Sequence, residues 1–488
     1  MKKPILISTA LLAVSSAIAT DSPNIILIMA DDLGWGDVGF NGNTIIKTPH
    51  LDALATEGVV FDRFYTACAV SSPTRNSCLT GRNPYRTGIF HANVGIMRQE
   101  ELTTMELLKT KGYTSGHFGK WHLGSLTDKQ KDANRGRVGN SAEVNPPSLH
   151  GYDDSFVTES KVPTYDPMIA PVGKKGSFWD YVKDGEERKS YGTAYWNHDG
   201  TQATENLSGD DSRVIMDRVL PFIDKASQKQ TPFMSVVWFH TPHLPCVAGP
   251  KEQEIYKDYP LQKRNYYGCI TAMDEQVGRL VKHLKDNGLF DNTLIFFCSD
   301  NGPEGNDSAP GTTAGMRGRK RSLYEGGIRV PGFMVWGNKI NGGNRTDAPC
   351  FTSDYMPTIL DIVGIRKSNP HQLDGESIMP LVSGKRPKSE RTRPMVFVFQ
   401  GQAAVVDNQY KLYYLGDKYE LYDLRADRSE TTDIADKHPK LVERYTAILK
   451  EHVANYKCSF SGEEFSVKQL LNQTWTDPFL VSKEKASK

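Results

Sequence analysis

The sequence predicts an α/β protein in which a large sheet lies between helices and is followed by a small antiparallel sheet with one helix. Continuous apolar runs at 24–30, 233–239 and 293–298 are typical of strands that are buried on both faces. Between the last two runs, apolar residues recur at the spacing of one helix face: Ile270, Met273, Val277, Leu280 and Leu284. Strands that alternate with helices indicate an α/β sheet.

The first strand carries acidic residues at its end. The run 24–30 is followed directly by Asp31 and Asp32. The carboxyl ends of strands are where the active sites of open α/β sheets collect. The next predicted elements are a helix from Thr48-Pro49 to about Gly58, a helix near Leu107 and a strand at 113–118.

Residues 125–210 do not continue the alternation of strands and helices, because they are rich in Gly, Pro, Asn and Lys and carry scattered aromatic residues. We interpret this stretch as a set of loops that shape a substrate mouth, since long loops in compact domains are usually functional. A poorly ordered surface insertion is the alternative.

The pattern changes again near residue 391. Short strand-like runs at 396–399, 402–406 and 410–414 are followed by a helix with an apolar side made of Leu441, Tyr445, Ile448 and Leu449. We therefore predict a main domain over 20–390 and a C-terminal subdomain over 391–488.

Charge and the N-terminus limit the classes of function. The 488 residues carry 59 Lys and Arg against 58 Asp and Glu, which argues against a nucleic-acid-binding surface. Residues 1–19 have the pattern of a signal peptide, with two lysines, an apolar run and a small-residue cleavage site. A membrane anchor is the alternative, but the run is short and no Cys follows it for lipid attachment. We expect a periplasmic or secreted protein with no membrane span in the mature chain.

The most specific motif is Ser71-Ser72-Pro73-Thr74-Arg75, closed by the run L-T-G-R. Ser and Pro are also typical of a helix start, where the helix dipole favours anions. The motif resembles the C/S-x-P-x-R…L-T-G-R signature of the type I sulfatases, in its serine-type bacterial form. This resemblance implies an alkaline-phosphatase-like sandwich, with a large mixed sheet between helices and the catalytic sulfatase domain over 20–390.

The resemblance also implies a modified residue. In this family the first residue of the signature is converted to formylglycine, whose hydrate attacks sulfur. Ser71 would therefore be the modified residue, the nucleophile and a metal ligand, and Arg75 would orient its oxygens. A serine at this position implies an anaerobic sulfatase-maturing radical enzyme as a partner. The reaction would be hydrolysis of a sulfate ester, and a sulfated saccharide is the expected substrate.

Two acidic strand ends indicate a cation site. Asp31 and Asp32 follow one strand, and Asp300 and Asn301 follow another. Adjacent carboxylates repel each other unless a cation lies between them, and oxygen ligands suit Ca²⁺, or Mg²⁺ in a tighter site. Two solvated acidic turns are the alternative. The resemblance implies one Ca²⁺ held by these four residues together with the formylglycine at Ser71.

Three more motifs match the same family. The run G-K-W-H-L-G contains Lys120, which would hold sulfate, and His122, which would promote its release. In T-P-H-L-P, His243 would bind sulfate and is a candidate acid for the leaving oxygen. Lys320 precedes E-G-G-x-R-V-P and would bridge a sulfate oxygen and the leaving oxygen.

The sequence indicates the identity of the substrate less clearly than it indicates the reaction. We predict that Trp196, from the stretch 125–210, and Arg319, among neighbouring arginines, bind the sugar, although the arginines could simply be solvated. A phosphatase or phosphonate hydrolase on the same fold is the runner-up. Such phosphatases commonly hold two transition metals on His and Asp ligands, whereas this sequence indicates one oxygen-rich site. A catalytically inactive glycan-binding protein is the third possibility.

Overall fold

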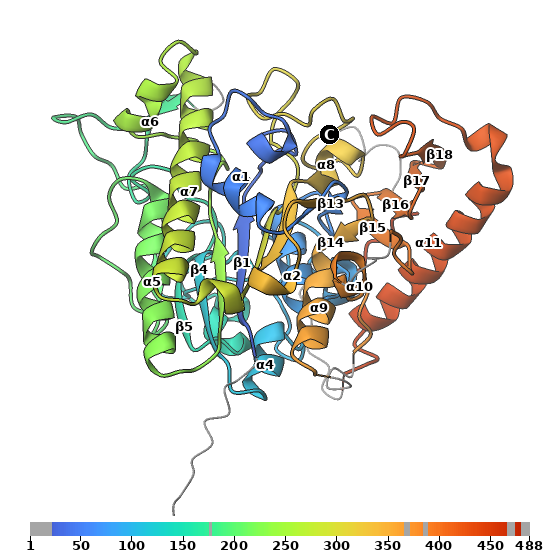
Figure 1. Ribbon diagram of the computed structural model, residues 1–488, viewed down its shortest axis with the longest axis horizontal. Helices are drawn as coiled ribbons and strands as arrows, with labels where there is room; N and C mark the ends of the chain where they lie inside the picture. The colour runs from blue at the N-terminus through green and yellow to red at the C-terminus, as the bar shows by residue number, and fades with distance from the viewer. Residues whose placement is uncertain (1–21, 175–177, 366–370, 384–388, 466–473, 480–488) are drawn as a thin grey trace, which may run out of the picture.

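A nine-stranded sheet forms the centre of the protein (Figure 1) in the computed structural model, which describes residues 22–479 apart from 175–177, 366–370, 384–388 and 466–473. The strands from β10 to β5 run parallel, while β12 and β8 pair antiparallel with their neighbours. The predicted large mixed sheet is confirmed. In sheet order the strands are β13 (Asn344–Thr346), β2 (Val59–Phe61), β12 (Gly332–Trp336), β10 (Thr293–Ser299), β1 (Asn24–Ala30), β9 (Phe233–Trp238), β4 (Thr114–Lys120), β5 (Asp154–Thr158) and β8 (Trp196–Asn197).

Helices cover both faces of this sheet, because the side chains of its central strands are apolar in both directions. Ile25 and Leu27 of β1 pack into one core with the helices α2, α4 and α9, whereas Ile26 and Ile28 pack into the other with α1, α5 and α7. Figure 1 shows α5 and α7 on one side of β1 and α9 on the other. The helices around the sheet are α1 (Pro49–Thr56), α2 (Ser71–Thr80), α3 (Pro84–Thr87), α4 (Thr104–Lys109), α5 (Asp211–Gln228), α6 (Pro250–Ile255), α7 (Leu261–Asp286), α8 (Glu325–Ile328), α9 (Tyr355–Ile362) and α10 (Met379–Val382).

The stretch 125–210 is more regular than its composition indicates. It contributes β5 and β8 to one edge of the large sheet, and a separate hairpin forms from β6 (Val172–Lys174) and β7 (Phe178–Asp180). The prediction of loops alone is therefore wrong in part. The remainder of the stretch consists of turns and irregular segments.

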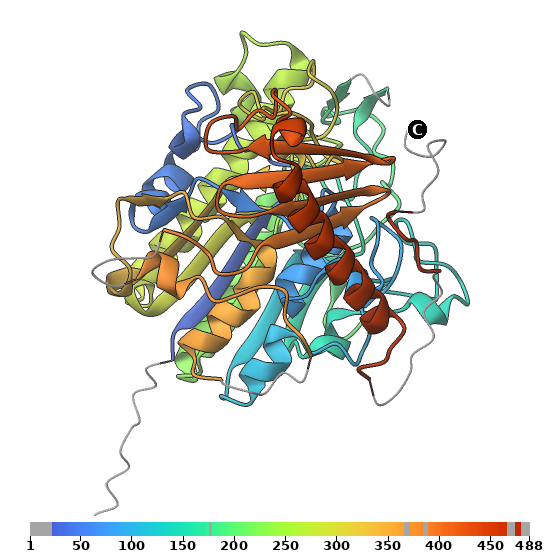
Figure 2. The ribbon, with the colours of Figure 1, turned by 90° about the vertical axis from the view of Figure 1, so that its right-hand side faces the viewer.

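The predicted C-terminal antiparallel sheet with a helix is confirmed. Its alternate side chains face two cores: Phe397 and Phe399 pack toward the main domain, and Val396 and Val398 pack toward α11. Figure 2 shows α11 lying across the outer face of this sheet. A fourth strand, which the sequence reasoning did not identify, completes it. The elements are β15 (Met395–Phe399), β16 (Gln402–Val406), β17 (Tyr410–Leu415), β18 (Lys418–Asp423) and α11 (Pro439–Phe460).

The predicted signal peptide, 1–19, lies outside the described residues. Within the part of the chain that the structure does describe, none of the helices combines the length and the apolar character that a membrane crossing requires.

A buried ion cluster joins the C-terminal sheet to the main domain. The Lys411 ammonium on β17 lies 3.1 Å from a Glu325 carboxylate oxygen and 2.8 Å from one of Glu430, and all three side chains are inaccessible to solvent. Burial raises the pKa of Glu430 to about 7, and the nearby Glu325 charge adds to this against the opposing Lys411 charge. Lys411 is thus the cation shared by two buried carboxylates.

Replacement of Lys411 by Ala should lower the free energy of unfolding by about 3 kcal/mol or more, because two carboxylates would remain buried without their shared cation. Urea unfolding followed by circular dichroism measures the change. Lys418→Ala is the matched control, since Lys418 is 68% exposed and pairs with Glu420, so its loss should cost less than about 1 kcal/mol. Equal stability of the two variants would contradict this account of the cluster.

Candidate active site

The carboxyl ends of four parallel strands meet at one edge of the sheet and carry most of the predicted site. Asp31 and Asp32 follow β1, and Asp300 and Asn301 follow β10. Lys120 is the last residue of β4, His122 comes shortly after it, and His243 follows β9. The N-terminal half of α2 adds Ser71 and Arg75 from the layer of helices beside the sheet. Residues that lie hundreds of positions apart in the sequence are brought together in this way.

Ser71 lies at the centre of these groups. Its side-chain oxygen accepts hydrogen bonds from the Lys120 ammonium at 3.0 Å and from Arg75 Nε at 3.2 Å, and its hydroxyl contacts the Asp300 carboxylate. Ser71 is the first residue of α2 and only 2% exposed, so its oxygen lies in the positive field of the helix N-terminus. This environment stabilises negative charge on an oxygen at position 71.

Three cations balance three buried carboxylates. Lys120 Nζ lies 2.6 Å from Asp31, and Arg75 Nη2 lies 2.8 Å from Asp300. Lys320 Nζ lies 2.7 Å from Asp32, and the residues concerned are almost inaccessible to solvent. The cluster is therefore close to neutral by itself, and an added divalent cation would give it the positive charge that a bound anion needs.

The donor set fits a hard cation. Asn301 Nδ2 donates to Asp32 at 2.6 Å and to the Gly302 carbonyl at 2.9 Å, whereas Asn301 Oδ1 is buried and has no hydrogen-bond partner among the described residues. An unpartnered buried amide oxygen beside two carboxylates is a ligand set of the kind that Ca²⁺ prefers. Asp32 also has a left-handed backbone with φ of 67°, a costly conformation that is typical of functional sites.

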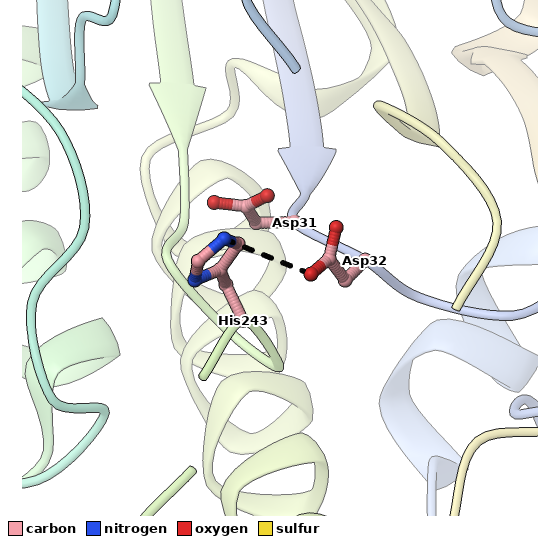
Figure 3. A group of neighbouring side chains, drawn as sticks. All are labelled: Asp31, Asp32 and His243. Atoms are coloured by element: carbon pink, nitrogen blue, oxygen red, sulfur yellow. Dashed lines mark ion pairs between the residues drawn. The ribbon is translucent and has the colours of Figure 1, made fainter. Parts of the chain in front are cut away.

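Figure 3 shows Asp31, Asp32 and His243 facing one another. One potential ligand atom from each of the three lies within 4.8 Å of the others, and His243 Nε2 is 3.8 Å from Asp32. The Nδ1 atom of His243 lies 2.7 Å from the Leu244 carbonyl, which orients the ring. His243 thus borders the candidate cation site, a position that its motif did not indicate.

The pKa values of the site reflect burial and charge together. Burial raises the pKa of Asp300 to about 7, and the Asp31 charge adds to this effect. Burial opposes ionisation of Asp31 as well, but Lys120, His243 and Arg75 hold the pKa of its carboxyl well below the usual range. Burial lowers the pKa of His243 to about 4 despite the nearby Asp31. Of the two carboxylates beside Ser71, Asp300 is thus the better proton acceptor near neutral pH.

Close backbone contacts place Lys320 beside Asp32. A Cβ atom on Gly302 would lie 2.0 Å from the Gly326 carbonyl oxygen, so only glycine permits the turn after β10 to touch the first residues of α8. Glu304, four residues after Asp300, lies 3.4 Å from Lys320 Nζ and pairs with Arg321 as well. Sequence analysis did not identify Glu304, although it lies only two residues after the D-N-G turn.

Trp196 and Arg319 were both predicted to bind the sugar, and the structure gives a different outcome for each. Trp196 is 7% exposed on β8, packs in the core and donates its indole N–H to Asp132 at 2.9 Å, so the prediction that it binds substrate is wrong. Arg319 Nη2 donates to the carbonyls of Glu304 and Gly311 at 3.0 and 2.8 Å. The role of Arg319 toward the sugar stays a prediction, and its contacts support the loop instead.

A buried hydroxyl surrounded by cations, beside a cluster of carboxylates at the ends of parallel strands, is the site of a hydrolase that acts on anionic esters. The family model described as Sulfatase matches residues 23–365, and one described as N-sulphoglucosamine sulphohydrolase, C-terminal, matches residues 318–457. The chain belongs to the sulfatase family, within the alkaline phosphatase-like superfamily, and is a sulfuric ester hydrolase.

Relatives of known name share less than a third of their residues with this chain. The N-acetylgalactosamine-6-sulfatase of Canis lupus familiaris is 28% identical over 418 residues, which cover 81% of this chain and 72% of the relative. The steryl-sulfatase of Rattus norvegicus is 29% identical over 429 residues, with 75% and 71% covered. The crystal structure of Ps i-CgsB in complex with k-i-k-neocarrahexaose superposes on this protein with a TM-score of 0.73. The two sequences are 28% identical, and the match covers 91% of this chain and 94% of that one.

Proposed function

We propose that this sulfatase removes a sulfate group from a sulfated carbohydrate, with a formylglycine formed from Ser71 and one bound Ca²⁺. The observation that carries the proposal is the environment of Ser71, whose oxygen contacts Lys120, Arg75 and Asp300 at the buried start of α2. A formylglycine at this position supplies, when hydrated, the hydroxyl that attacks sulfur. These three groups would hold and activate that hydroxyl.

Each residue has a task that follows from its contacts. Asp300 accepts a proton from the attacking hydroxyl, since its carboxylate contacts the position 71 oxygen directly. Arg75 and Lys120 stabilise negative charge on the same oxygen through charge-assisted hydrogen bonds. Asp31, Asp32, Asp300 and Asn301 would hold the Ca²⁺, which supplies positive charge to the sulfate oxygens.

Two side chains, Lys320 and His243, could stabilise or protonate the leaving oxygen. Lys320 lies beside Asp32 with its ammonium group, and charges on Asp32, Asp31 and Glu304 outweigh burial and raise the pKa of Lys320. His243 is 15% exposed, whereas Asp32 is 1% exposed, so its ring lies on the outer side of the cluster. We assign Lys320 to charge stabilisation. We assign His243 to proton donation in the substrate complex, where the negative charge of the bound sulfate would raise the pKa of the ring and favour a proton on Nε2.

Lys320→Ala and His243→Ala should each lower kcat for a small aryl sulfate by a factor on the order of 10² or more, because each removes charge stabilisation or a general acid from the transition state. Steady-state kinetics measures both constants. Lys285→Ala is the control: it removes an ordinary surface ion pair with Glu57, and kcat should remain at the wild-type value. A change in KM alone would contradict the catalytic assignment.

The modification itself is tested by mass. A tryptic peptide that contains residue 71 should be lighter by two hydrogen atoms than the encoded sequence when the protein is produced with an anaerobic sulfatase-maturing radical enzyme. The same preparation should begin at residue 20 if the predicted signal peptide is removed on export to the periplasm or medium. An unmodified serine in an active enzyme would contradict the proposed nucleophile.

The carbohydrate substrate is supported by a polar cavity of about 660 Å³ whose lining includes Pro250 at the start of α6. Tyr165 and Tyr181, with ring centroids 5.9 Å apart, line it together with Lys183 and Arg188. Thr164, the neighbour of Tyr165, hydrogen-bonds the Val247 carbonyl at 2.7 Å, which connects the cavity to the segment that carries His243. Aromatic faces among charged groups suit a saccharide unit adjacent to the one that loses sulfate. The named relatives that act on or bind saccharides support the same class.

Tyr181→Ala and Lys183→Ala should raise KM for a sulfated oligosaccharide several-fold and leave kcat and the kinetics of a small aryl sulfate unchanged. Contacts far from the reacting bond contribute uniform binding, whose loss appears in KM. Lys189→Ala is the control, because Lys189 is exposed and pairs with Glu187 outside the lining of the cavity. Equal effects on large and small substrates would contradict the assignment, and faster cleavage of a steryl sulfate than of any sulfated saccharide would contradict the proposed substrate class.

A further inference from the structure

We propose that Asn93 is a positioning residue that holds the neutral His122 ring in the tautomer with its proton on Nε2, so that Nδ1 is the proton-accepting atom. The inference rests on the proposed function together with the prediction from the sequence that His122 promotes release of sulfate. No motif pointed to Asn93, which lies in the irregular segment after α3.

The contact between the two side chains is short and has a definite polarity. His122 Nε2 lies 2.7 Å from Asn93 Oδ1, and Asn134 Nδ2 donates to the same oxygen at 2.9 Å. Asn134 Nδ2 also donates to Ser160 Oγ at 2.9 Å. An amide oxygen only accepts hydrogen bonds, so the ring nitrogen that faces it must carry the proton.

The other ring nitrogen is left free. His122 is 4% exposed, and its Nδ1 atom is buried with no hydrogen-bond partner in the part of the chain that the structure describes. A neutral imidazole has one proton, and with that proton on Nε2 the Nδ1 atom presents a lone pair. Burial, together with the charges of Lys120, Arg135 and Arg75, holds the pKa of His122 well below its usual range, which keeps the ring neutral.

The backbone around this contact is held in place from several sides. Asn93 and His122 both have left-handed backbones, with φ of 63° and 61°, and asparagine is one of the few residues that adopt this conformation readily. The Glu159 carboxylate accepts the Asn134 backbone N–H at 2.9 Å and Arg135 Nε at 2.9 Å. Asn93 thus contacts the ring nitrogen, Asn134 holds Asn93, and Glu159 holds the segment of Asn134. Such a chain of supporting hydrogen bonds is suited to orienting a catalytic histidine.

A pair of variants separates positioning from packing. Asn93→Gly keeps a residue that tolerates the left-handed backbone and deletes the amide, whereas Asn93→Asp keeps an acceptor oxygen. Because Asn93 is exposed, neither change opens a cavity. We expect kcat for a small aryl sulfate to fall by a factor on the order of 10² in Asn93→Gly, with KM within about threefold of wild type, and Asn93→Asp to recover most of the loss. Wild-type kcat in Asn93→Gly, or equal losses in both variants, would overturn the proposal.

A spectroscopic measurement tests the tautomer without relying on activity. The protein is labelled with ¹⁵N in its histidines, and the His122 signals are identified by their disappearance in His122→Gln. We expect a protonated Nε2 and an unprotonated Nδ1, and a loss of this preference in Asn93→Gly. A protonated Nδ1 would show that Asn93 presents its nitrogen to the ring and would overturn the assignment. If no sulfate ester is hydrolysed while the expected tautomer is observed, the proposed function fails and the tautomer assignment stands.

Discussion

Ser71→Ala is expected to abolish sulfate ester hydrolysis, with kcat lower by a factor on the order of 10⁵ or more, the size of loss seen when a catalytic nucleophile is removed. The variant loses the oxygen to which Lys120 and Arg75 donate and which contacts Asp300. It cannot be converted to formylglycine, because alanine has no hydroxyl to oxidise. The groups around position 71 remain, so residual binding of sulfate is expected.

The fold should survive this change. Ser71 is buried at the first position of α2, and alanine is a better helix former than serine, so only the contacts of one hydroxyl are lost. Ser77→Ala is the matched control on the same helix. Ser77 is equally buried but donates to the Thr74 carbonyl and contacts Thr352, away from the cations. Wild-type kcat in Ser71→Ala, or an equal loss in Ser77→Ala, would contradict the assignment of the nucleophile.

Removal of divalent cations by a chelator is expected to remove activity, and added Ca²⁺ to restore it. Three buried carboxylates and one unpartnered amide oxygen converge on this site, and without a divalent ion their charge is balanced by Lys120, Arg75 and Lys320 alone. A cation that binds only the folded protein also stabilises it, by about 2.7 kcal/mol at a concentration one hundred times its Kd. The melting temperature should therefore rise on titration with Ca²⁺.

Variants of Asn301 test the proposed calcium site more directly than a chelator does. Asn301→Ala deletes the unpartnered oxygen and should raise the Ca²⁺ concentration needed for half-maximal activity at least tenfold, whereas Asn301→Asp retains an oxygen ligand and should not. Asn306→Ala, in the exposed loop that follows, is the control. Full activity after exhaustive chelation would contradict the metal site, and two zinc ions per chain would favour phosphatase chemistry instead.

Local patterns were enough to predict the strands and helices that are most apolar. The run 24–30 is β1 to the residue, and the runs near 233 and 293 are β9 and β10. A strand that is buried on both faces is a continuous apolar run, so the sequence alone is enough to locate it. Other strands were harder to predict. β8 and β18 lie at sheet edges, and β5 and β12 are only five residues long, so the place of each depends on which neighbours it pairs with.

The sequence by itself determined which chemical groups are present: the serine of the signature, the acidic residues after two central strands, and the lysines and histidines of the remaining motifs. These follow from short patterns in which the residue type defines the chemistry. Only the tertiary structure decided which atoms meet. Trp196 lies in the core because β8 pairs with β5, Lys411 is shared between Glu325 and Glu430, and Asn93 reaches the ring of His122. Such contacts join segments far apart in the chain, and no local pattern encodes them, because each depends on how the whole sheet and its loops are packed.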